Sequence, residues 1–338
     1  MQLEKHASLL PYNTFGIDVQ AELLAHIGSM EDLRTALSDE SLRQHERLIL
    51  GGGSNVLFTR GFEGLVLLNR LKGISVVKED EHHVWVKAGA GEVWHELVTW
   101  TVNQGWGGME NLSLIPGSVG AGPLQNIGAY GVELKDVFHE LEALRMDTLE
   151  VERFNATDCR FGYRESVFKH ELKNQFFISS VTFRLSKHPV LNTSYGAIAQ
   201  ELSKQGIAHP GVKDVSEAVI RIRRSKLPDP AVLGNAGSFF KNPEVDQETA
   251  DRIRIEHPTL MSYPTTPGLV KLAAGWLIEQ CGWKGKVVGH TGAHKDQALV
   301  LVNYGGATGN EIYELALEIR ENVLQRFGVR IDPEVNVV

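Results

Sequence analysis

The chain has 338 residues. A domain with a single core usually has about 100 to 200 residues, so we expect two or three packed domains. Hydrophobic residues make up 42% and charged residues 22%, which is typical of a globular enzyme and excludes a largely disordered or fibrous chain. The formal net charge of -8 argues against nucleic acid as a partner, because phosphate-backbone binders need a basic surface.

The first third of the chain alternates apolar runs with turns and therefore predicts a sheet. Strand patterns occupy 47–50, 56–58, 64–69, 73–79 and 83–89. A helix is predicted at 91–105, ended by Gly105, with an apolar stripe formed by Val93, Trp94, Leu97, Val98 and Val102. Strand patterns return at 149–154 and 176–185.

The second half predicts helices with clear stop signals. A helix from 214 is halted by Pro228 and Pro230, and KLPDP at 226–230 is the candidate linker. A Thr308/Glu311 capping box opens another helix. The remaining predicted elements are amphipathic helices at 268–282 and 308–328, a strand at 297–303 and a strand-like tail at 329–338.

The cysteine content and the hydropathy indicate a cytoplasmic protein. Cys159 and Cys281 are too few for a disulfide framework and lie outside any spacing that suits zinc. The N-terminus shows no signal-peptide pattern, and no run of about 18 consecutive apolar residues occurs. We therefore expect a reducing compartment and no membrane partner.

The sequence GGGSN at 51–55 follows the first predicted strand and forms a candidate phosphate cradle. Its three glycines let backbone amides approach an anion closely, and Ser54 adds a hydroxyl donor. Neither a Walker pattern nor a GxGxxG that opens a helix occurs, so neither standard nucleotide fold is predicted. A tight hairpin explains the same glycines equally well.

A second stretch, 115–133, has five glycines and few charges. Such backbone can lie flush against a flat ligand, although it can also be only a set of turns. Gln125, Asn126 and Tyr130 add amide and phenol groups able to read the edge of a ring system. Together the two stretches favour a dinucleotide held by something other than a Rossmann fold.

Two further residues carry candidate chemistry. Arg164 lies among aromatic residues and is either a salt-bridged surface group or a guanidinium aimed at a carboxylate. Ser238 is a lone hydroxyl between Gly237 and two phenylalanines, outside any GxSxG motif. An acyl-transfer enzyme with a distant histidine and aspartate stays open from spacing alone.

Two weaker patterns have ordinary structural explanations. RIRRSK at 221–226 is a solvated helix end or, less often, a local anion site. His290 and His294 are four residues apart, but two glycines lie within GHTGAH, which indicates a turn. We therefore assign no metal.

Ordered motifs along nearly the whole chain resemble the UDP-N-acetylenolpyruvoylglucosamine reductase family of bacterial cell-wall synthesis. The motifs are LPYNTFGI, GGGSNVL, GAGEVWHELV, PGSVGAGPLQNIGAYGVE, CRFGYRES, KLPDP, GNAGSFFKNP and DPEVNVV. NTSYGAI at 192–198 is similar to the tyrosine-bearing loop of type I members. Several ordered motifs at sensible spacing are far more specific than any one of them.

The resemblance implies an α+β fold with a two-lobed FAD-binding domain of the vanillyl-alcohol oxidase type and a C-terminal α+β substrate domain. The expected ranges are a first lobe at 1–72, which the C-terminal tail can complete, a second lobe at 73–225 with the tyrosine loop near 192–198, and a substrate domain at 226–338. The resemblance also implies noncovalent FAD, NADPH as the reductant and a sugar nucleotide as the substrate. We expect a monomer.

The resemblance also implies the roles of individual residues. The FAD residues are Gly51, Gly52, Gly53, Ser54, Asn55, Ser118, Gly120, Gly122, Gln125, Asn126, Gly128, Tyr130 and Arg164. The residues that hold the UDP diphosphate and the sugar are Tyr195, Lys226 and Asn242. The catalytic residues are Ser238, Arg164 and Glu334.

The implied reaction adds hydride to the terminal carbon of an enolpyruvyl group and leaves negative charge on C2 and its carboxylate. Arg164 and a protonated Glu334 stabilise that charge, and Ser238 gives the proton to C2. Phe239 and Phe240 would exclude water from the serine. A flavin oxidase of the same fold that uses oxygen, and a flavin-binding redox sensor without turnover, are the competing hypotheses.

Overall fold

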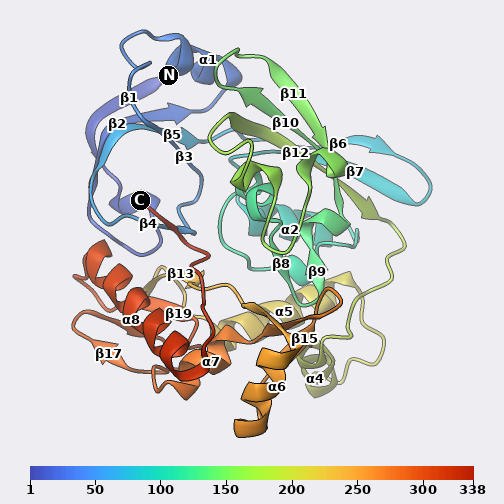
Figure 1. Cartoon of the computed structure of the whole chain (residues 1–338). Coiled ribbons are helices and arrows are strands. Elements are labelled where there is room, and N and C mark those ends of the chain that lie inside the picture. Colours follow the sequence, from blue (N-terminus) through green and yellow to red (C-terminus); the bar gives the residue numbers. More distant parts are fainter. The chain divides into compact units, whose positions relative to one another are not determined.

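The computed structural model describes residues 1–338, with Pro264 described by its backbone only. The chain divides into two compact units, each discontinuous in sequence (Figure 1). Unit 1 comprises Met1–Ala7, Ala21–Gly52 and Glu63–Ser225, and unit 2 comprises Ser8–Gln20, Gly53–Phe62 and Lys226–Val338. The glycine turn at 51–55 is therefore divided, with its first two residues in unit 1 and the other three in unit 2.

The first sheet of unit 1 has the strand order β1-β2-β5-β3. Its strands are β1 (Gln2–Ser8), β2 (Gln20–Ile27), β3 (Arg47–Leu50) and β5 (Phe62–Asn69). Helix α1 (Met30–Ser38) begins after Ser29, whose hydroxyl accepts a hydrogen bond from the Asp32 amide. Leu33 of this helix packs into one apolar core with Leu65 and Leu67 of β5.

The second sheet of unit 1 is antiparallel, with the order β11-β10-β12-β7-β6. Its strands are β6 (Ile74–Glu79), β7 (His83–Gly89), β10 (Phe138–Arg145), β11 (Val151–Asn155) and β12 (Phe176–Ser186). The central strand β12 is buried on both faces, since Phe177 joins the core beneath α1 while Phe183 joins the core beneath α2 (Trp94–Asn103). This explains why the predicted segment 176–185 carries apolar residues for both faces of the strand.

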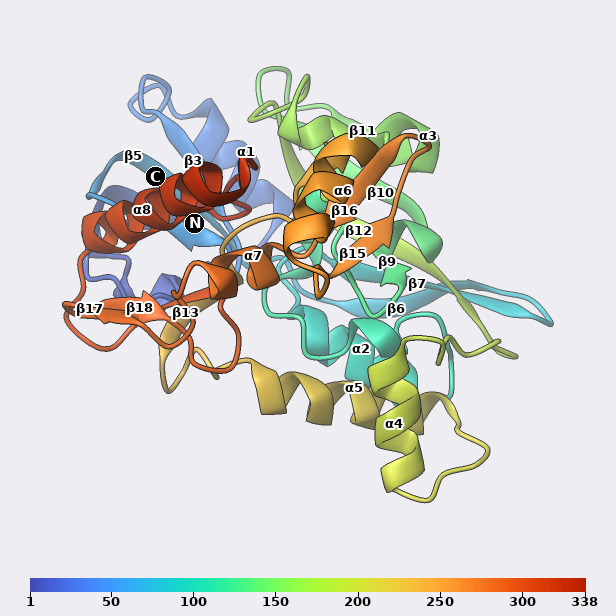
Figure 2. The same ribbon diagram turned by 60° about the horizontal axis from the view of Figure 1, so that its bottom comes forward.

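Two helices complete unit 1. Helices α4 (Gly196–Lys204) and α5 (Val212–Lys226) lie side by side and share a small core that contains Ile198, Leu202, Val215 and Val219 (Figure 2). The short elements of this unit are η2 (Glu110–Leu112), η3 (Val119–Ala121), η4 (Pro123–Gln125), β8 (Gly128–Ala129), β9 (Val132–Glu133), η5 (Leu134–Asp136), α3 (Ala156–Cys159) and η6 (Val167–Lys169).

Unit 2 is built on two small sheets, with the orders β13-β19-β18-β17 and β14-β16-β15, and a short parallel pair of β4 and β20. The strands are β4 (Val56–Leu57), β13 (Gly234–Ser238), β14 (Glu244–Asp246), β15 (Ser262–Pro264), β16 (Leu269–Leu272), β17 (Val287–Val288), β18 (Thr291–Ala293), β19 (Val300–Asn303) and β20 (Asn336–Val337). The helices are η1 (Leu10–Tyr12), α6 (Gln247–Glu256), α7 (Ala274–Gln280) and α8 (Gly309–Phe327).

Helix α8 closes the core of unit 2, and the sequence pattern predicted it. Ile312, Leu315, Ile319 and Val323 fall on one buried face at the spacing of a helix. The Thr308 capping box is present, and Gly328 ends the helix in the left-handed conformation at φ 68°. Within the described residues, we find no helix whose length and apolar character would let it cross a membrane.

Three local predictions are wrong. The helix predicted at 268–282 begins only at Ala274, because Leu269–Leu272 form strand β16 between β14 and β15. The hairpin interpretation of the glycine turn fails, since β3 pairs with β5 whereas β4 pairs with β20. Val93 is exposed, because it precedes helix α2 as its N-cap instead of lying on its apolar stripe.

Candidate functional site

The first two glycines of the turn allow an unusually close approach of two chain segments in unit 1. A Cβ atom on Gly51 would collide with the Ser118 hydroxyl, and one on Gly52 would lie 3.1 Å from the Gly117 Cα. The turn and the start of the second glycine-rich stretch are therefore in backbone contact. Two such strips in close contact give a surface on which backbone amides can approach a dinucleotide phosphate group.

Residues 118–131, which we call the cofactor loop, pack against the sheet in the same way. A Cβ on Gly120 would lie 2.5 Å from the Ala90 Cβ, and one on Gly122 would lie 2.7 Å from the Leu134 Cδ1. The Gly120 amide donates to the Ala90 carbonyl at 2.8 Å. These glycines therefore keep the loop flat on its support, which leaves its other side for a flat ligand.

Asn126 shapes the cofactor loop from within. It is fully buried and adopts the left-handed conformation at φ 45°. Its Nδ2 donates to the Glu133 carboxylate and to the Gly162 carbonyl, both at 3.0 Å, and its Oδ1 accepts from the Lys135 amide at 3.0 Å. The sequence predicted that the Asn126 amide would bind a ring system, but the amide is used for hydrogen bonds inside the protein. Asn126 therefore contributes to a cofactor site by holding the loop in place.

Arg164 is brought onto the same loop. Its Nη2 donates to the Gly128 carbonyl at 2.9 Å, and its own backbone lies in the left-handed region at φ 56°. The Lys169 ammonium donates to the Arg164 carbonyl at 3.1 Å and so fixes the turn that carries it. Three predicted FAD residues, Asn126, Gly128 and Arg164, therefore lie in one hydrogen-bonded group of unit 1.

Arg223 of helix α5 is a residue near the cofactor loop to which sequence reasoning gave no role. It forms a side-chain hydrogen bond with Tyr130, and its Nε donates to the Leu114 carbonyl at 3.2 Å. Burial lowers the pKa of Arg223, although a guanidinium remains charged at neutral pH. The only sequence signal was the basic run at 221–226.

Tyr130 also meets the residue predicted to bind substrate on residues 192–198, the tyrosine loop. The rings of Tyr130 and Tyr195 contact edge to face, with centroids 5.3 Å apart. Burial raises the pKa of Tyr130, so its phenol stays protonated near neutral pH. Tyr195 itself is 44% exposed, as a residue that meets a ligand from solvent would be.

In unit 2, Ser238 lies at the end of a β-bulge. Strand β13 pairs with β19 through Asn235 and Ser238, and the register shifts between them. Gly237 takes the left-handed conformation at φ 69°, and its amide donates to the Asn235 Oδ1 at 2.9 Å. The buried asparagine therefore holds the bulge that turns the Ser238 hydroxyl outward, where it is exposed.

The two phenylalanines after Ser238 act as anchors. Phe239 and Phe240 are fully buried in the core of unit 2, with ring centroids 5.1 Å apart. The Phe239 amide donates to the Leu299 carbonyl at 2.8 Å, which continues the pairing with β19. These contacts fix the backbone on the C-terminal side of the serine.

The C-terminal tail runs beside this anchored segment. The Glu334 amide donates to the Phe239 carbonyl at 2.8 Å, and Phe240 and Pro333 form an antiparallel bridge. The Asn55 side chain donates to the Glu334 carbonyl at 3.2 Å. Unit 2 thus brings together three predicted residues from distant parts of the sequence, namely Ser238, Glu334 and Asn55.

The remaining predicted residues have simpler surroundings. The Asn242 Oδ1 accepts from the Ala274 amide at 3.0 Å and so caps helix α7. Lys226 is exposed at the end of α5, and Gln125 is half-buried in η4. Gly53 is buried in unit 2, where a Cβ would collide with the Tyr12 carbonyl, and Ser54 beside it is half-buried.

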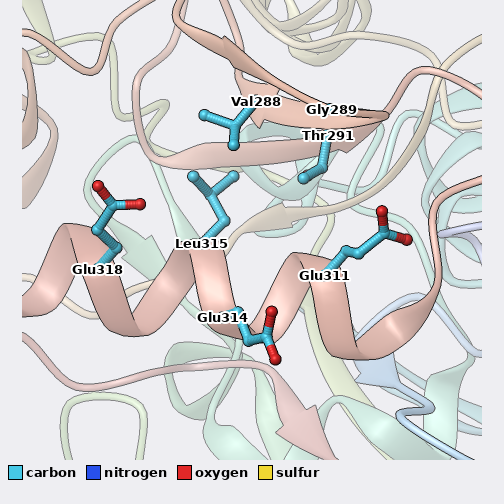
Figure 3. Close-up of a pocket in the computed structure, with 7 residues that line it drawn as sticks. All are labelled: Val288, Gly289, Thr291, Glu311, Glu314, Leu315 and Glu318. Atoms are coloured by element: carbon cyan, nitrogen blue, oxygen red, sulfur yellow. The ribbon is translucent and has the colours of Figure 1, made fainter.

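A separate pocket of unit 2 has the wrong charge for a phosphate ligand. Three glutamates of α8 line it, and Figure 3 shows Leu315 facing Val288 across it. Hydrogen bonds from Thr308 hold the pKa of Glu311 below its usual value, so this carboxylate is ionised at neutral pH. Its lining residues are Val288, Gly289, Thr291, Glu311, Glu314, Leu315 and Glu318, which differ from every predicted site residue.

Comparisons with known proteins match two parts of this chain to family models. A family model described as an FAD binding domain matches residues 21–152, and one described as the C-terminal domain of UDP-N-acetylenolpyruvoylglucosamine reductase matches residues 229–338. The chain is 49% identical to the UDP-N-acetylenolpyruvoylglucosamine reductase of Flavobacterium johnsoniae over 100% of both chains. It is 52% identical to the protein of the same name from Pseudomonas aeruginosa, over 100% of this chain and 99% of the relative.

Solved structures share the fold. A UDP-N-acetylenolpyruvylglucosamine reductase from Thermus caldophilus superposes with a TM-score of 0.69 at 24% identity, over 100% of this chain and 99% of the other. A 6-hydroxy-D-nicotine oxidase from Arthrobacter nicotinovorans gives a TM-score of 0.50 at 12% identity, over 97% and 86%. The predicted class is confirmed: an α+β fold with an FAD-binding domain of the vanillyl-alcohol oxidase type.

Proposed function

We propose a mechanism for this chain from one premise: it belongs to the UDP-N-acetylenolpyruvoylglucosamine reductase family. It is an FAD-dependent oxidoreductase of peptidoglycan synthesis that reduces the enolpyruvyl group of a UDP-sugar to give UDP-N-acetylmuramate, with NADPH as reductant. The observation that carries the site assignment is the bulge at Gly237, which exposes the Ser238 hydroxyl beside the tail segment that carries Glu334.

The glycine strips fit FAD, because Gly51 and Gly120 let the backbone pack tightly against Ser118 and Ala90, which leaves the opposite side flat for a phosphate-containing ligand. In our proposal, residues 51–55 hold the pyrophosphate and the cofactor loop lies along the flavin. FAD held there would supply the hydride chemistry, which takes hydride from NADPH to the terminal carbon of the enolpyruvyl group. Tyr130, fixed by Arg223, lies on that loop and stays neutral, which suits a group that donates a hydrogen bond to a cofactor.

Arg164 and Glu334 stabilise the charge that develops on C2 and its carboxylate. A guanidinium offers two parallel N–H donors that match a carboxylate, and Arg164 is held by the same loop that would support the flavin. Glu334 is fixed through its backbone to Phe239, so its position depends on the same strand as the serine. We assign both residues to the reacting end of the substrate.

Ser238 then gives a proton to C2. A serine hydroxyl is a weak acid, but the developing carbanion is a strong base, and a positioned donor needs no reorganisation at the moment of reaction. The bulge supports this role, because it places a small exposed hydroxyl on a backbone held by Asn235 on one side and by Phe239 on the other.

The UDP part of the substrate is held by Tyr195, Lys226 and Asn242. The exposed Lys226 ammonium is a point charge that suits a diphosphate, and Pro228 stiffens the chain beside it. Tyr195 offers a phenol beside the cofactor loop. We also infer the domain ranges 1–72, 73–225 and 226–338, a cytoplasmic monomer, and small molecules rather than membranes or nucleic acids as partners.

The decisive experiment separates the two half-reactions of the Ser238→Ala variant. Reduction by NADPH needs no proton at C2, so rapid mixing of the FAD-loaded variant with NADPH should give a nearly normal rate. Mixing the NADPH-reduced variant with the enolpyruvyl substrate should give a rate lower by about 100 to 10,000-fold, the usual contribution of a general acid. Ser238→Cys, with a more acidic thiol, should recover part of the loss.

Wild-type speed in the second half-reaction of Ser238→Ala would remove the proton-donor role. The serine would then only shape its turn, and alanine would cost about 1 kcal/mol of stability. A yellow protein that forms no lactyl product from NADPH and the UDP-enolpyruvyl sugar would instead favour a redox sensor. Rapid reoxidation in air after reduction would favour an oxidase.

A further inference from the structure

A buried residue of unit 1 hydrogen-bonds both the cofactor loop and the tyrosine loop. Asn111, in the short helix η2, is fully buried. Its Nδ2 donates to the Tyr130 carbonyl at 3.0 Å and to the Asn192 carbonyl at 2.9 Å. One amide group thus uses its two hydrogens on two loops that are 62 residues apart in the sequence, counted from residue 130 to residue 192.

The amide oxygen of Asn111 differs from its nitrogen in having no hydrogen-bond partner within the described part of the chain. Among the described residues, the Asn111 Oδ1 is a buried side-chain oxygen with no hydrogen-bond partner. An isolated buried acceptor destabilises the fold, and the two hydrogen bonds that the same amide donates offset this cost. The asparagine therefore serves the two carbonyls that it binds.

Asn192 strengthens the connection from the other loop. Its Nδ2 donates to the Gly131 carbonyl at 3.1 Å, and its Oδ1 accepts from the Ser194 hydroxyl at 2.7 Å. Gly131 is in the left-handed conformation at φ 79°, and a Cβ there would lie 3.2 Å from the Asn192 Nδ2. The turn that ends the cofactor loop therefore rests directly on the base of the tyrosine loop.

The side chains of Tyr130 and Tyr195 also connect the two loops. Tyr130, at φ 51°, holds a strained conformation whose ring meets the Tyr195 ring edge to face. Its phenol is bound to Arg223. A shift of residues 130–131 would therefore be transmitted to Tyr195 by the ring contact and by the Asn111 hydrogen bonds together.

We propose that Asn111 is a positioning residue that makes the affinity for the sugar nucleotide depend on the occupancy of the cofactor site. The inference rests on the proposed function, in which the cofactor loop contacts FAD and Tyr195 contacts the substrate. A cofactor that orders residues 130–131 also orders the tyrosine loop through Asn111. Thermodynamic linkage then requires the reciprocal effect. Binding of a UDP-sugar must lower the dissociation constant of FAD by the same factor.

The test follows amide hydrogen exchange in the whole chain, stripped of FAD and then reloaded. In the wild type, FAD should slow exchange at 192–198 by about fivefold or more, in addition to its effect on the cofactor loop. In Asn111→Ala, FAD should still protect the cofactor loop, but protection at 192–198 should fall below about twofold. UDP-N-acetylglucosamine should lower the FAD dissociation constant in the wild type and leave it unchanged in the variant.

Steady-state kinetics provide a second readout. Asn111→Ala should raise the KM for the sugar nucleotide by about 5 to 20-fold and change the rate of reduction by NADPH by less than about twofold. Asn69→Ala is the matched control, because Asn69 is also buried in unit 1 and donates to the Ile178 carbonyl at 3.1 Å. It should lose comparable stability with an unchanged KM.

The outcomes separate this inference from the proposed function. A chain that takes up no FAD overturns both. A chain that takes up FAD, with exchange at 192–198 unaffected in the wild type or equally affected in Asn111→Ala, overturns the role of Asn111 alone. If Asn111→Ala does not fold, Asn111→Leu keeps a side chain of similar size without the two donors and must show the same loss of protection.

Discussion

At the scale of single residues, His95 stabilises the approach to the cofactor loop. Its Nδ1 accepts from the Leu114 amide at 3.0 Å, and Leu114 is held in the left-handed conformation at φ 57°. Arg223 binds the carbonyl of the same leucine. A non-glycine residue in this region costs about 1 to 3 kcal/mol, and these two hydrogen bonds offset part of that cost.

The protonation state of His95 should therefore affect stability. Burial lowers the pKa of His95 below 6.5, and the positive charges of Arg224 and Arg223 lower it further, while Glu96 opposes them. The unfolded chain takes up a proton near pH 6.5, whereas the folded chain takes it up only at lower pH. The contribution of neutral His95 to stability is thus complete above pH 6.5 and declines as the pH falls toward the folded pKa.

We predict that His95→Gln, which keeps an acceptor but does not titrate, loses this part of the pH dependence. Urea unfolding between pH 5.5 and 7.5 should show the wild type losing stability on acidification faster than the variant. His209→Gln is the control, because His209 is exposed. Parallel curves for the wild type and His95→Gln would show that the histidine titrates equally in the folded and unfolded chains.

Sequence reasoning identified residues that belong to a motif and overlooked those that support one. Arg164 and Ser238 stand in recognisable contexts, so they could be predicted. His95, Asn111 and Arg223 could not, because each is defined by a backbone group that folding brings to it from a distant segment. Asn126 was predicted as an FAD residue, but its amide binds protein groups beside its own loop, which only the hydrogen bonds reveal.

At the scale of elements, the bulge in β13 determines where the Ser238 hydroxyl lies. Gly237 has φ 69°, and a Cβ there would meet no atom within 4 Å. Alanine would therefore introduce backbone strain of about 1 to 2 kcal/mol without a collision. We predict that Gly237→Ala slows the substrate half-reaction at least about tenfold, because a small displacement of a proton donor has a large effect on the rate.

Gly282→Ala is the control that separates the effect of backbone strain from the effect of moving the Ser238 hydroxyl. Gly282 also belongs to unit 2 and has φ 78°, and a Cβ there would likewise meet no atom within 4 Å. Both variants should lose similar stability by urea unfolding, while rapid mixing with substrate should show slow turnover of Gly237→Ala only. Equal rates in the two variants would mean that the bulge geometry has no part in proton transfer.

Helix α8 and strand β16 show which elements a pattern can predict. Helix α8 has apolar residues at helical spacing along one face and a signal at each end, so propensity, periodicity and capping agree. Residues 269–272 are apolar at positions that suit either a helix or a strand. They form a strand because β14 and β15 supply partners on both sides, and pairing with distant segments has no local signal.

At the scale of the whole molecule, the discontinuity of the two units also lacked a local signal. Residues 8–20 and 53–62 belong to unit 2 through contacts with the C-terminal part of the chain. The Asn235 amide donates to the Thr14 carbonyl, and the tail pairs with Val56 and Leu57. Unit 2 thus takes in two segments from the first part of the chain, while Gly51, Gly52 and the cofactor loop remain in unit 1.

This arrangement leads to a final prediction about the cofactor. Residues 51–55 and 118–131 contain no histidine or cysteine that could form a covalent link, so acid precipitation should release the yellow colour into the supernatant. FAD at 100 times its dissociation constant should stabilise the folded chain by about 2.7 kcal/mol and raise its Tm.

Gly51→Ala should take up little FAD, because the new methyl group would collide with Ser118. Gly28→Ala is the control and should behave as wild type, since the atom nearest to its new methyl group would lie 3.5 Å away. Colour that stays on the pellet, or a normal FAD content in Gly51→Ala, would overturn the cradle as a noncovalent FAD site.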